Sequence, residues 1–203
     1  YYGGSGFDQG LGVAVDGLGN VYLCGTTGST TNVAVGGFQT TFGGAQDAFL
    51  VKFDATTGNR IWSTYYGGAG GENGFSVATD ATGNVYLSGV SASTNNIGSG
   101  GFQNTYAGGG LNGDAFLVKF DAAGNRMWGT YYGGAAEELN SSVATDAAGN
   151  VFLVGTTLSP TSIASGGFQN TYGGGWGTYG DNFLVKFDAA GIRQWATYYG
   201  GVG

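Results

Sequence analysis

The stretch Tyr65-Tyr66-Gly67-Gly68 decides the fold, because the same four residues occur four times in the chain. The copies begin at Tyr1, Tyr65, Tyr131 and Tyr198, with spacings of 64, 66 and 67 residues. Each interval contains Gly-Asn-Val-Tyr/Phe-Leu, then Gly-Gly-Phe-Gln, then Phe-Leu-Val-Lys-Phe-Asp and then a Trp. Self-similarity at a fixed period is typical of propellers and repeat arrays.

The composition favours strands over helices. The 203 residues include 45 Gly, 1 Pro, 13 Tyr and 13 Phe, and only 9% are charged, against roughly 25% in ordinary domains. Glycine and aromatic residues at this level favour short strands joined by tight turns. No window has helical apolar spacing over three turns. We therefore predict an all-β protein.

Several functional classes are disfavoured by what the chain lacks. The net charge of −7 argues against nucleic acid as a partner, because phosphate binding needs clustered Lys and Arg. No apolar run approaches the roughly 18 residues of a membrane span, so we expect no membrane insertion. The chain has no His, no Gly-x-Ser-x-Gly motif and no P-loop, which predicts that it is not an enzyme.

The remaining compositional features suggest an exported protein. The single Cys24 excludes an internal disulfide, and Ser88 and Val154 occupy its position in the other repeats, so we expect a small buried residue. A surface rich in Gly, Thr, Ser and Asn predicts an extracellular or cell-surface location, in a bacterium. The chain begins and ends within the repeated motif, as a segment of a longer array or a processed chain would.

Each repeat is predicted to form four strands. The first strands are expected at residues 12–16, 76–80 and 142–146, the second at 21–26, 85–90 and 151–156, the third at 48–54, 115–121 and 182–188, and the fourth at 60–66, 126–132 and 193–199. Turns of the form Asp-x-x-Gly-Asn join the first two strands. Two hairpins per repeat make a four-stranded antiparallel sheet, the unit of a propeller blade. We predict one repeat domain, residues 1–203, with blades at about 7–66, 73–132 and 139–199.

These motifs resemble the SBBP-type β-propeller repeats of bacterial surface proteins, and more distantly NHL blades. The resemblance covers essentially the whole chain, three times over. It implies a β-propeller fold and a place in large, secreted, adhesin-like proteins. It supplies no catalytic motif.

The number of repeats leaves the architecture open. Closed propellers typically have four to eight blades, so three blades need more from a longer polypeptide or from copies of the chain. Copies could close a ring or stack into an open fibre. A closed threefold domain, a β-trefoil or β-prism, is the competing interpretation. The long period and the hairpin pattern favour a partial propeller or repeat array.

Nearly all charges repeat, which favours structural roles. Each repeat has one Lys within an apolar strand: Lys52, Lys119 and Lys186. A buried Lys needs a partner, so we expect an acid within salt-bridge reach. The Asp-x-x-Gly-Asn turn lacks the oxygen ligands of a calcium loop, and turn chemistry explains it without an ion.

Three further acids, Asp8, Glu72 and Glu138, are expected in the glycine-rich link between blades. They could form an acidic ring that binds Ca²⁺ or a cationic partner. They could instead cap backbone N–H groups of neighbouring blades, which we favour. We therefore predict no cofactor and no metal site, with Ca²⁺ as the weaker alternative.

The long connections carry aromatic and amide side chains, which are suited to polysaccharide. Phe102, Gln103, Phe168 and Gln169 are candidates, although such residues could equally fold back onto the sheet. Trp176 and Tyr179 lie outside the repeat pattern and are the first choice for a contact surface.

The sequence thus favours a non-enzymatic extracellular structural protein, completed by like repeats. A carbohydrate-binding, adhesin-like module is the alternative. A polysaccharide-degrading propeller whose remaining residues lie outside this segment is the second alternative.

Overall fold

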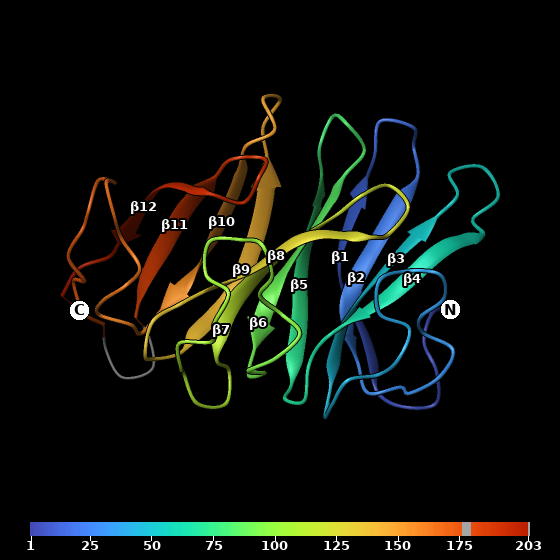
Figure 1. Cartoon of the computed structure of the whole chain (residues 1–203), viewed down its shortest axis with the longest axis horizontal. Coiled ribbons are helices and arrows are strands. Elements are labelled where there is room, and N and C mark those ends of the chain that lie inside the picture. The colour runs from blue at the N-terminus through green and yellow to red at the C-terminus, as the bar shows by residue number, and fades with distance from the viewer. Residues whose placement is uncertain (176–179, 203) are drawn as a thin grey trace.

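The computed structural model describes residues 1–175 and 180–202. These residues form three four-stranded antiparallel sheets and no helix. Figure 1 shows the sheets following one another along the long axis, with the two termini at opposite ends. The predictions of an all-β chain and of three four-stranded sheets are confirmed.

Each sheet is a meander, in which strands adjacent in sequence are hydrogen-bonded neighbours. Sheet 1 contains β1 (Asp8–Val15), β2 (Val21–Thr27), β3 (Asp47–Phe53) and β4 (Arg60–Tyr66). Sheet 2 contains β5 (Glu72–Thr79), β6 (Val85–Ser91), β7 (Asp114–Phe120) and β8 (Arg126–Tyr132). Sheet 3 contains β9 (Glu138–Thr145), β10 (Val151–Thr157), β11 (Asp181–Phe187) and β12 (Arg193–Tyr199).

The fourth strands have the predicted limits, whereas the first strands begin about four residues early. Asp8, Glu72 and Glu138 are the first residues of β1, β5 and β9, so their expected place in the link was wrong. Glycine weakens a strand, yet Gly10 still pairs with β2, and a bulge between Gly10 and Gly12 absorbs the irregularity. The expectation failed because pairing with β2 outweighs the low strand propensity of glycine.

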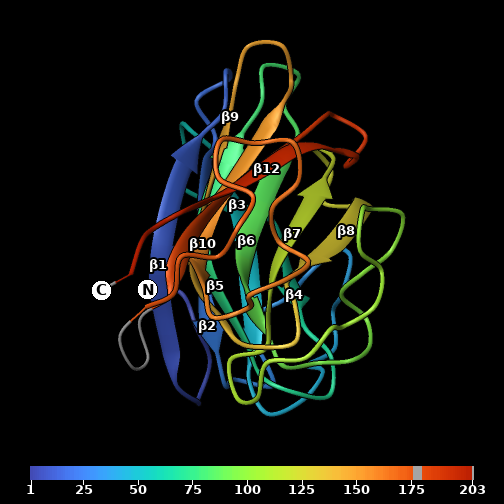
Figure 2. The same cartoon turned by 90° about the vertical axis from the view of Figure 1, so that its left-hand side faces the viewer.

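The sheets pack face to face in sequence order. Strand β5 contacts β1, β2 and β3, and β9 contacts β5, β6 and β7. The hydroxyl of Thr79 donates to the carbonyl of Val15 at 3.0 Å, and that of Thr145 donates to the carbonyl of Thr79 at 2.8 Å. Viewed from the side of the C-terminus, the sheets lie one behind another (Figure 2). The first strands therefore lie side by side.

Burial follows this stacking. Every residue of β7 is buried, because sheet 2 lies between the other two sheets. In sheet 1, β3 is nearly as buried, because Tyr2, Val33 and Phe42 cover its outer face. The equivalent β11 alternates between buried and more accessible residues, since one face of sheet 3 has no neighbour among the described residues. Cys24 is fully buried, as predicted, and burial raises the pKa of its thiol to about 12. No helix in the described ranges has the length and apolarity needed to cross a bilayer.

Candidate functional site

The junctions between successive sheets are the best-developed sites in the molecule. The junction between sheets 1 and 2 and the junction between sheets 2 and 3 use the same residue types at the same repeat positions. Each has a lysine–tryptophan network at one end of the third strand, an aromatic core beside the long connection, and buried acids at the other end.

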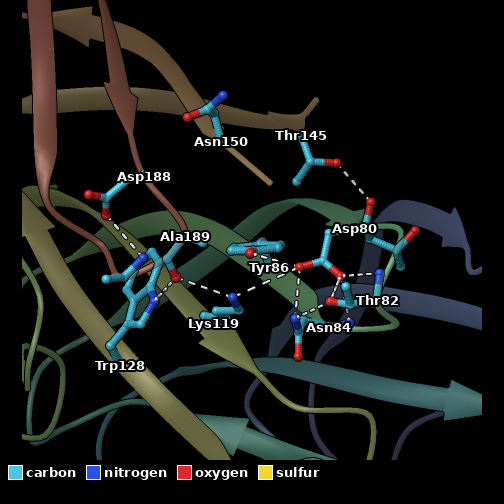
Figure 3. A network of polar contacts seen from close by, with 12 residues as sticks. Asp80, Thr82, Asn84, Tyr86, Lys119, Trp128, Thr145, Asn150, Asp188 and Ala189 are labelled. Atoms are coloured by element: carbon cyan, nitrogen blue, oxygen red, sulfur yellow. Dashed lines mark hydrogen bonds and ion pairs between the residues drawn. The ribbon is translucent and has the colours of Figure 1, made fainter. Parts of the chain in front are cut away.

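The lysine–tryptophan network of the second junction is drawn in Figure 3. The buried Lys119 places Nζ 3.9 Å from Asp80 Oδ2 and donates to the carbonyl of Ala189 at 3.2 Å. The indole Nε1 of Trp128 donates to the same carbonyl at 3.1 Å. The ammonium also lies 5.3 Å from the ring centroid of Tyr86. One backbone carbonyl of sheet 3 is therefore held by two donors of sheet 2.

The first junction repeats this network. Lys52 Nζ lies 3.5 Å from Asp16 Oδ2, and Lys52 and Trp62 donate to the carbonyl of Ala122 at 3.4 and 3.0 Å. The expected acid partner is thus present for Lys52 and Lys119. Burial lowers the pKa of the Lys119 ammonium, and the attraction of its acid partner opposes that shift.

The acid partner is fixed by its own turn. Asp80 accepts hydrogen bonds from the side chains of Thr82 and Asn84 at 2.7 and 2.8 Å, and from the hydroxyl of Tyr86 at 3.0 Å. Burial disfavours its charged form, but these hydrogen bonds outweigh burial and lower the pKa of Asp80 to about 2. Turn chemistry accounts for the motif, as the sequence suggested. Across the described residues, no three acid, Cys or His side chains are grouped to hold a metal.

Two glycines make room for the tryptophans. A Cβ on Gly124 would lie 2.8 Å from the ring of Trp62, and a Cβ on Gly191 would lie 2.9 Å from the ring of Trp128. The equivalent Gly58 of sheet 1 has nothing within 4 Å of that position. Sequence reasoning treated these glycines only as turn residues. The available signal was their recurrence four residues before each Trp, in the turn that leads into the fourth strand.

The aromatic core joins the end of one sheet to the next. Tyr132 packs on Phe183 and Phe187 with ring centroids 5.2 and 5.8 Å apart, and its hydroxyl donates to the carbonyl of Ile163 at 2.5 Å. Tyr66 makes the same contacts at the first junction, with Phe116, Phe120 and Ile97.

The same place on sheet 1 is filled by Tyr2. Its ring centroid lies 5.2 Å from that of Phe49, and its hydroxyl donates to the carbonyl of Val33 at 2.5 Å. The last Tyr of each Tyr-Tyr-Gly-Gly motif, where a sheet follows it, therefore packs on that sheet.

The predicted loop residues are used within the molecule. The guanidinium of Arg193 lies 4.3 Å above the ring of Phe102. Gln103 donates to Asp114 Oδ2 at 2.9 Å and accepts from the backbone N–H of Gly133 at 3.2 Å. Gln169 donates to the carbonyl of Thr171 at 2.9 Å. These amides hold their own long connections in place.

The predicted acids bind donors of their own and neighbouring repeats. Glu72 accepts from the backbone N–H of Gly68 at 2.8 Å and from the hydroxyl of Ser91 at 2.7 Å. Asp8 accepts from the backbone N–H of Gly4 at 2.8 Å. Glu138 accepts from the hydroxyl of Thr157 at 2.6 Å. The contacts of Glu72 and Asp8 are those expected if these acids cap backbone N–H groups.

The face of sheet 3 that corresponds to the junction faces of sheets 1 and 2 has no neighbouring sheet among the described residues. Phe168 is 88% exposed, whereas the equivalent Phe102 is 39% exposed. Tyr199 is 70% exposed, whereas the equivalent Tyr132 is 1% exposed. Lys186 has no acid within 4.0 Å among the described residues. A shallow apolar groove of about 400 Å³ is lined by Gly166, Gly167, Phe168, Leu184, Trp195 and Thr197.

Of the candidates from sequence, Trp176 and Tyr179 lie outside the described residues. Phe102 and Gln103 lie in the long connection at the second junction, Glu72 and Glu138 lie between sheets, and Gln169 lies in the long connection of sheet 3. Asp8 is the first residue of β1 in sheet 1. Phe168 belongs to the open face of sheet 3. Comparison with known proteins finds no matching family model and no similar curated sequence.

Proposed function

We propose that this chain is a non-enzymatic, extracellular structural repeat protein whose open sheet faces are covered by further repeats of the same kind. The observation that carries the proposal is the contrast between two completed junctions and a third face with the same residues left open. Lys186, Trp195 and Tyr199 stand at positions that are buried in both preceding sheets, and Phe168 is more exposed than its equivalents Phe38 and Phe102.

The opposite end of the chain offers part of the matching surface: its turn at residues 55–58 is exposed, whereas Tyr2 already fills the place that would receive Tyr199. Ala55 and Gly58 of sheet 1 lie in the turn that corresponds to the one where Ala122 and Gly124 receive Lys52 and Trp62, although the turn of sheet 1 is one residue longer. A further copy would therefore place Trp195 against Gly58 and the carbonyl of Ala55. Such a head-to-tail contact is heterologous, so it either closes a ring or continues as a fibre.

The way in which the three sheets stack supports the architecture that we propose. Four-stranded meanders stacked face to face, with their first strands adjacent, are suited to be blades of a β-propeller. Three blades fall short of the typical four, so the ring or array would be completed by copies of the chain or by adjacent repeats of a longer one. This is the arrangement that the resemblance to SBBP-type repeats implies.

Sedimentation tests the proposal directly. We expect the chain of 20.5 kDa to associate in a concentration-dependent way, and Phe168→Glu to weaken that association. Leu111→Glu is the matched control, because Leu111 is equally exposed but lies in a loop away from this face. A chain that stays monomeric at every concentration, with both variants alike, would refute assembly from copies.

Carbohydrate binding is the second candidate, at the same face. The exposed ring of Phe168 beside the apolar groove could stack on a sugar ring, and Trp195 lines that groove. A glycan array would test this alternative with Phe168→Ala as the control. Binding that survives this change would place the sugar elsewhere.

A further inference from the structure

Each internal junction buries two carboxyl groups from different sheets against the same glycine. A Cβ on Gly133 would lie 2.2 Å from Glu138 Oε2 and 2.7 Å from Asp114 Oδ1. A Cβ on Gly67 would similarly lie 2.5 Å from a Glu72 oxygen and 2.4 Å from an Asp47 oxygen. The oxygens of each pair therefore flank one small space, which the absence of a glycine side chain keeps open.

These carboxyl groups are fully buried, and part of each pair has no hydrogen-bond partner. Asp114 and Glu138 are both 0% exposed, and neither Asp114 Oδ1 nor Glu138 Oε2 receives a donor. At the first junction, Asp47 Oδ1 is likewise buried without a hydrogen-bond donor among the described residues. A buried charged oxygen without a donor is costly, so a bound positive species would remove a large penalty.

Among the residues that the structure describes, no basic side chain supplies that charge. The titratable groups that face the two pairs are phenols and acids: Tyr65, Tyr66, Tyr106, Tyr131, Tyr132, Tyr198 and the adjacent Glu137. The ion pairs of the described residues involve Asp16 and Asp80, at the opposite end of the third strands. Two like charges would therefore face each other in a poorly solvated site.

A proton fits this site better than a metal ion. Each pair offers only two acids, whereas Ca²⁺ needs six to eight oxygen ligands. The other neighbours of the carboxyl groups are donors, such as the amide of Gln103 and the N–H of Ala107 on Asp114, and donors repel a cation. The Cα of Gly133 also lies beside the point where the two oxygens converge.

We propose that each junction is a proton-binding site, in which the Asp of one sheet and the Glu of the next share one proton, so that mild acid strengthens the packing of sheet on sheet. Burial raises the pKa of Asp47, Asp114 and Glu138 to about 7, and it raises that of Glu72. Because the groups of a pair interact, each pair titrates as a unit.

Sheet 3 carries half of a third site. Asp181 Oδ1 is buried, has no donor among the described residues and lies 2.2 Å from where a Cβ on Gly200 would stand. In an assembly of copies, Asp8 of the next copy would complete this pair only if Tyr199 and Gly200 displaced its Tyr2 and Gly3, which already occupy that place. The two internal sites do not depend on that assembly.

Stability measured at two pH values tests the proposal. The raised pKa values mean that the folded chain binds more protons than the unfolded chain between about pH 4 and pH 7, so stability falls as pH rises through this window. We expect the folding equilibrium constant from urea unfolding to be at least about tenfold larger per pair at about pH 5 than at about pH 8. In Asp114→Asn, the ratio of the folding equilibrium constants at the two pH values should shrink by the contribution of one pair. In Asp121→Asn, which changes an exposed turn, the ratio should be the same as in the unmodified chain.

Direct titration keeps the test independent of the variants. Carboxyl ¹³C resonances of the unmodified chain should show Asp114 and Glu138 retaining a proton above about pH 5. Carboxyl groups that are fully ionised at that pH would overturn the proposal. A rise in melting temperature on adding CaCl₂ at about pH 8, abolished by Asp114→Asn, would overturn it in favour of a cation.

Discussion

Substituting Ala for Gly124 tests how closely successive sheets pack. The new Cβ would lie 2.8 Å from the ring of Trp62, where neither the ring nor the backbone can move without disturbing the junction. Gly124 also has φ +87°, which costs about 1–2 kcal/mol for a residue with a Cβ. Overpacking against the ring adds about 1–3 kcal/mol. The free energy of unfolding should therefore fall by about 2–5 kcal/mol.

The chain provides its own control for the backbone term. Gly58 also precedes Asn in the corresponding turn of sheet 1, which is one residue longer, and it has φ +67° and nothing within 4 Å of its Cβ position. Gly58→Ala should lose only the conformational part, about 1–2 kcal/mol. The difference of about 1–3 kcal/mol between the two variants then isolates the contact with the indole.

Urea unfolding followed by tryptophan fluorescence would measure both variants, with m values compared to verify that the same surface is exposed. Gly191→Ala, which meets Trp128 at 2.9 Å, should match Gly124→Ala. Equal losses for Gly58→Ala and Gly124→Ala would refute the packing of the Trp62 ring on the turn. In the proposed assembly, Gly58→Ala should also weaken association, because Trp195 of another copy would meet the new methyl group.

Three further predictions follow from the junctions. Lys119→Met should lower the free energy of unfolding by about 1–3 kcal/mol, because two polar contacts to a buried ammonium are lost. Lys186→Met should change it by less than about 0.5 kcal/mol. Equal effects of the two substitutions in urea unfolding would contradict the lysine–tryptophan network. Asp80, with a pKa of about 2, should contribute about 2 kcal/mol above pH 4 and lose it as pH falls toward 2; an acid titration in which Asp80→Asn matches the unmodified chain would argue against this. Cys24 should resist alkylation in the folded chain and react on unfolding, since its thiol is buried with a pKa of about 12; rapid labelling of native protein, read by mass spectrometry, would speak against its burial.

Much of the fold could be predicted from the period alone. The repeated Phe-Leu-Val-Lys-Phe run indicated a strand buried on both faces, which holds for β3 and β7 but not for β11, where buried and more accessible residues alternate. The repeated Arg-to-Tyr segment had the correct limits in all three copies. Both patterns are local, because side-chain alternation and turn residues determine where such strands begin and end.

The junctions were less accessible because they depend on how one sheet is placed on the next. A pairing rule for buried Lys predicted an acid partner, without identifying Asp16 or Asp80, and it did not predict the shared carbonyl of Ala189. The pairing of Asp114 with Glu138 joins residues from two sheets, and no local pattern relates them. Repetition showed that these positions mattered, and only the three-dimensional arrangement showed what they contact.

The placement of Tyr2, Tyr66 and Tyr132 has a consequence for how such a chain can change in length. Each tyrosine ends one unit and is locked into the unit that follows, so a single period of sequence carries both sides of the same joint. Recombination that adds or removes one whole period would leave every remaining joint with its proper partners. Growth and shrinkage by unequal crossing-over are thus structurally neutral for this molecule, whereas the loss of a fraction of a period is not.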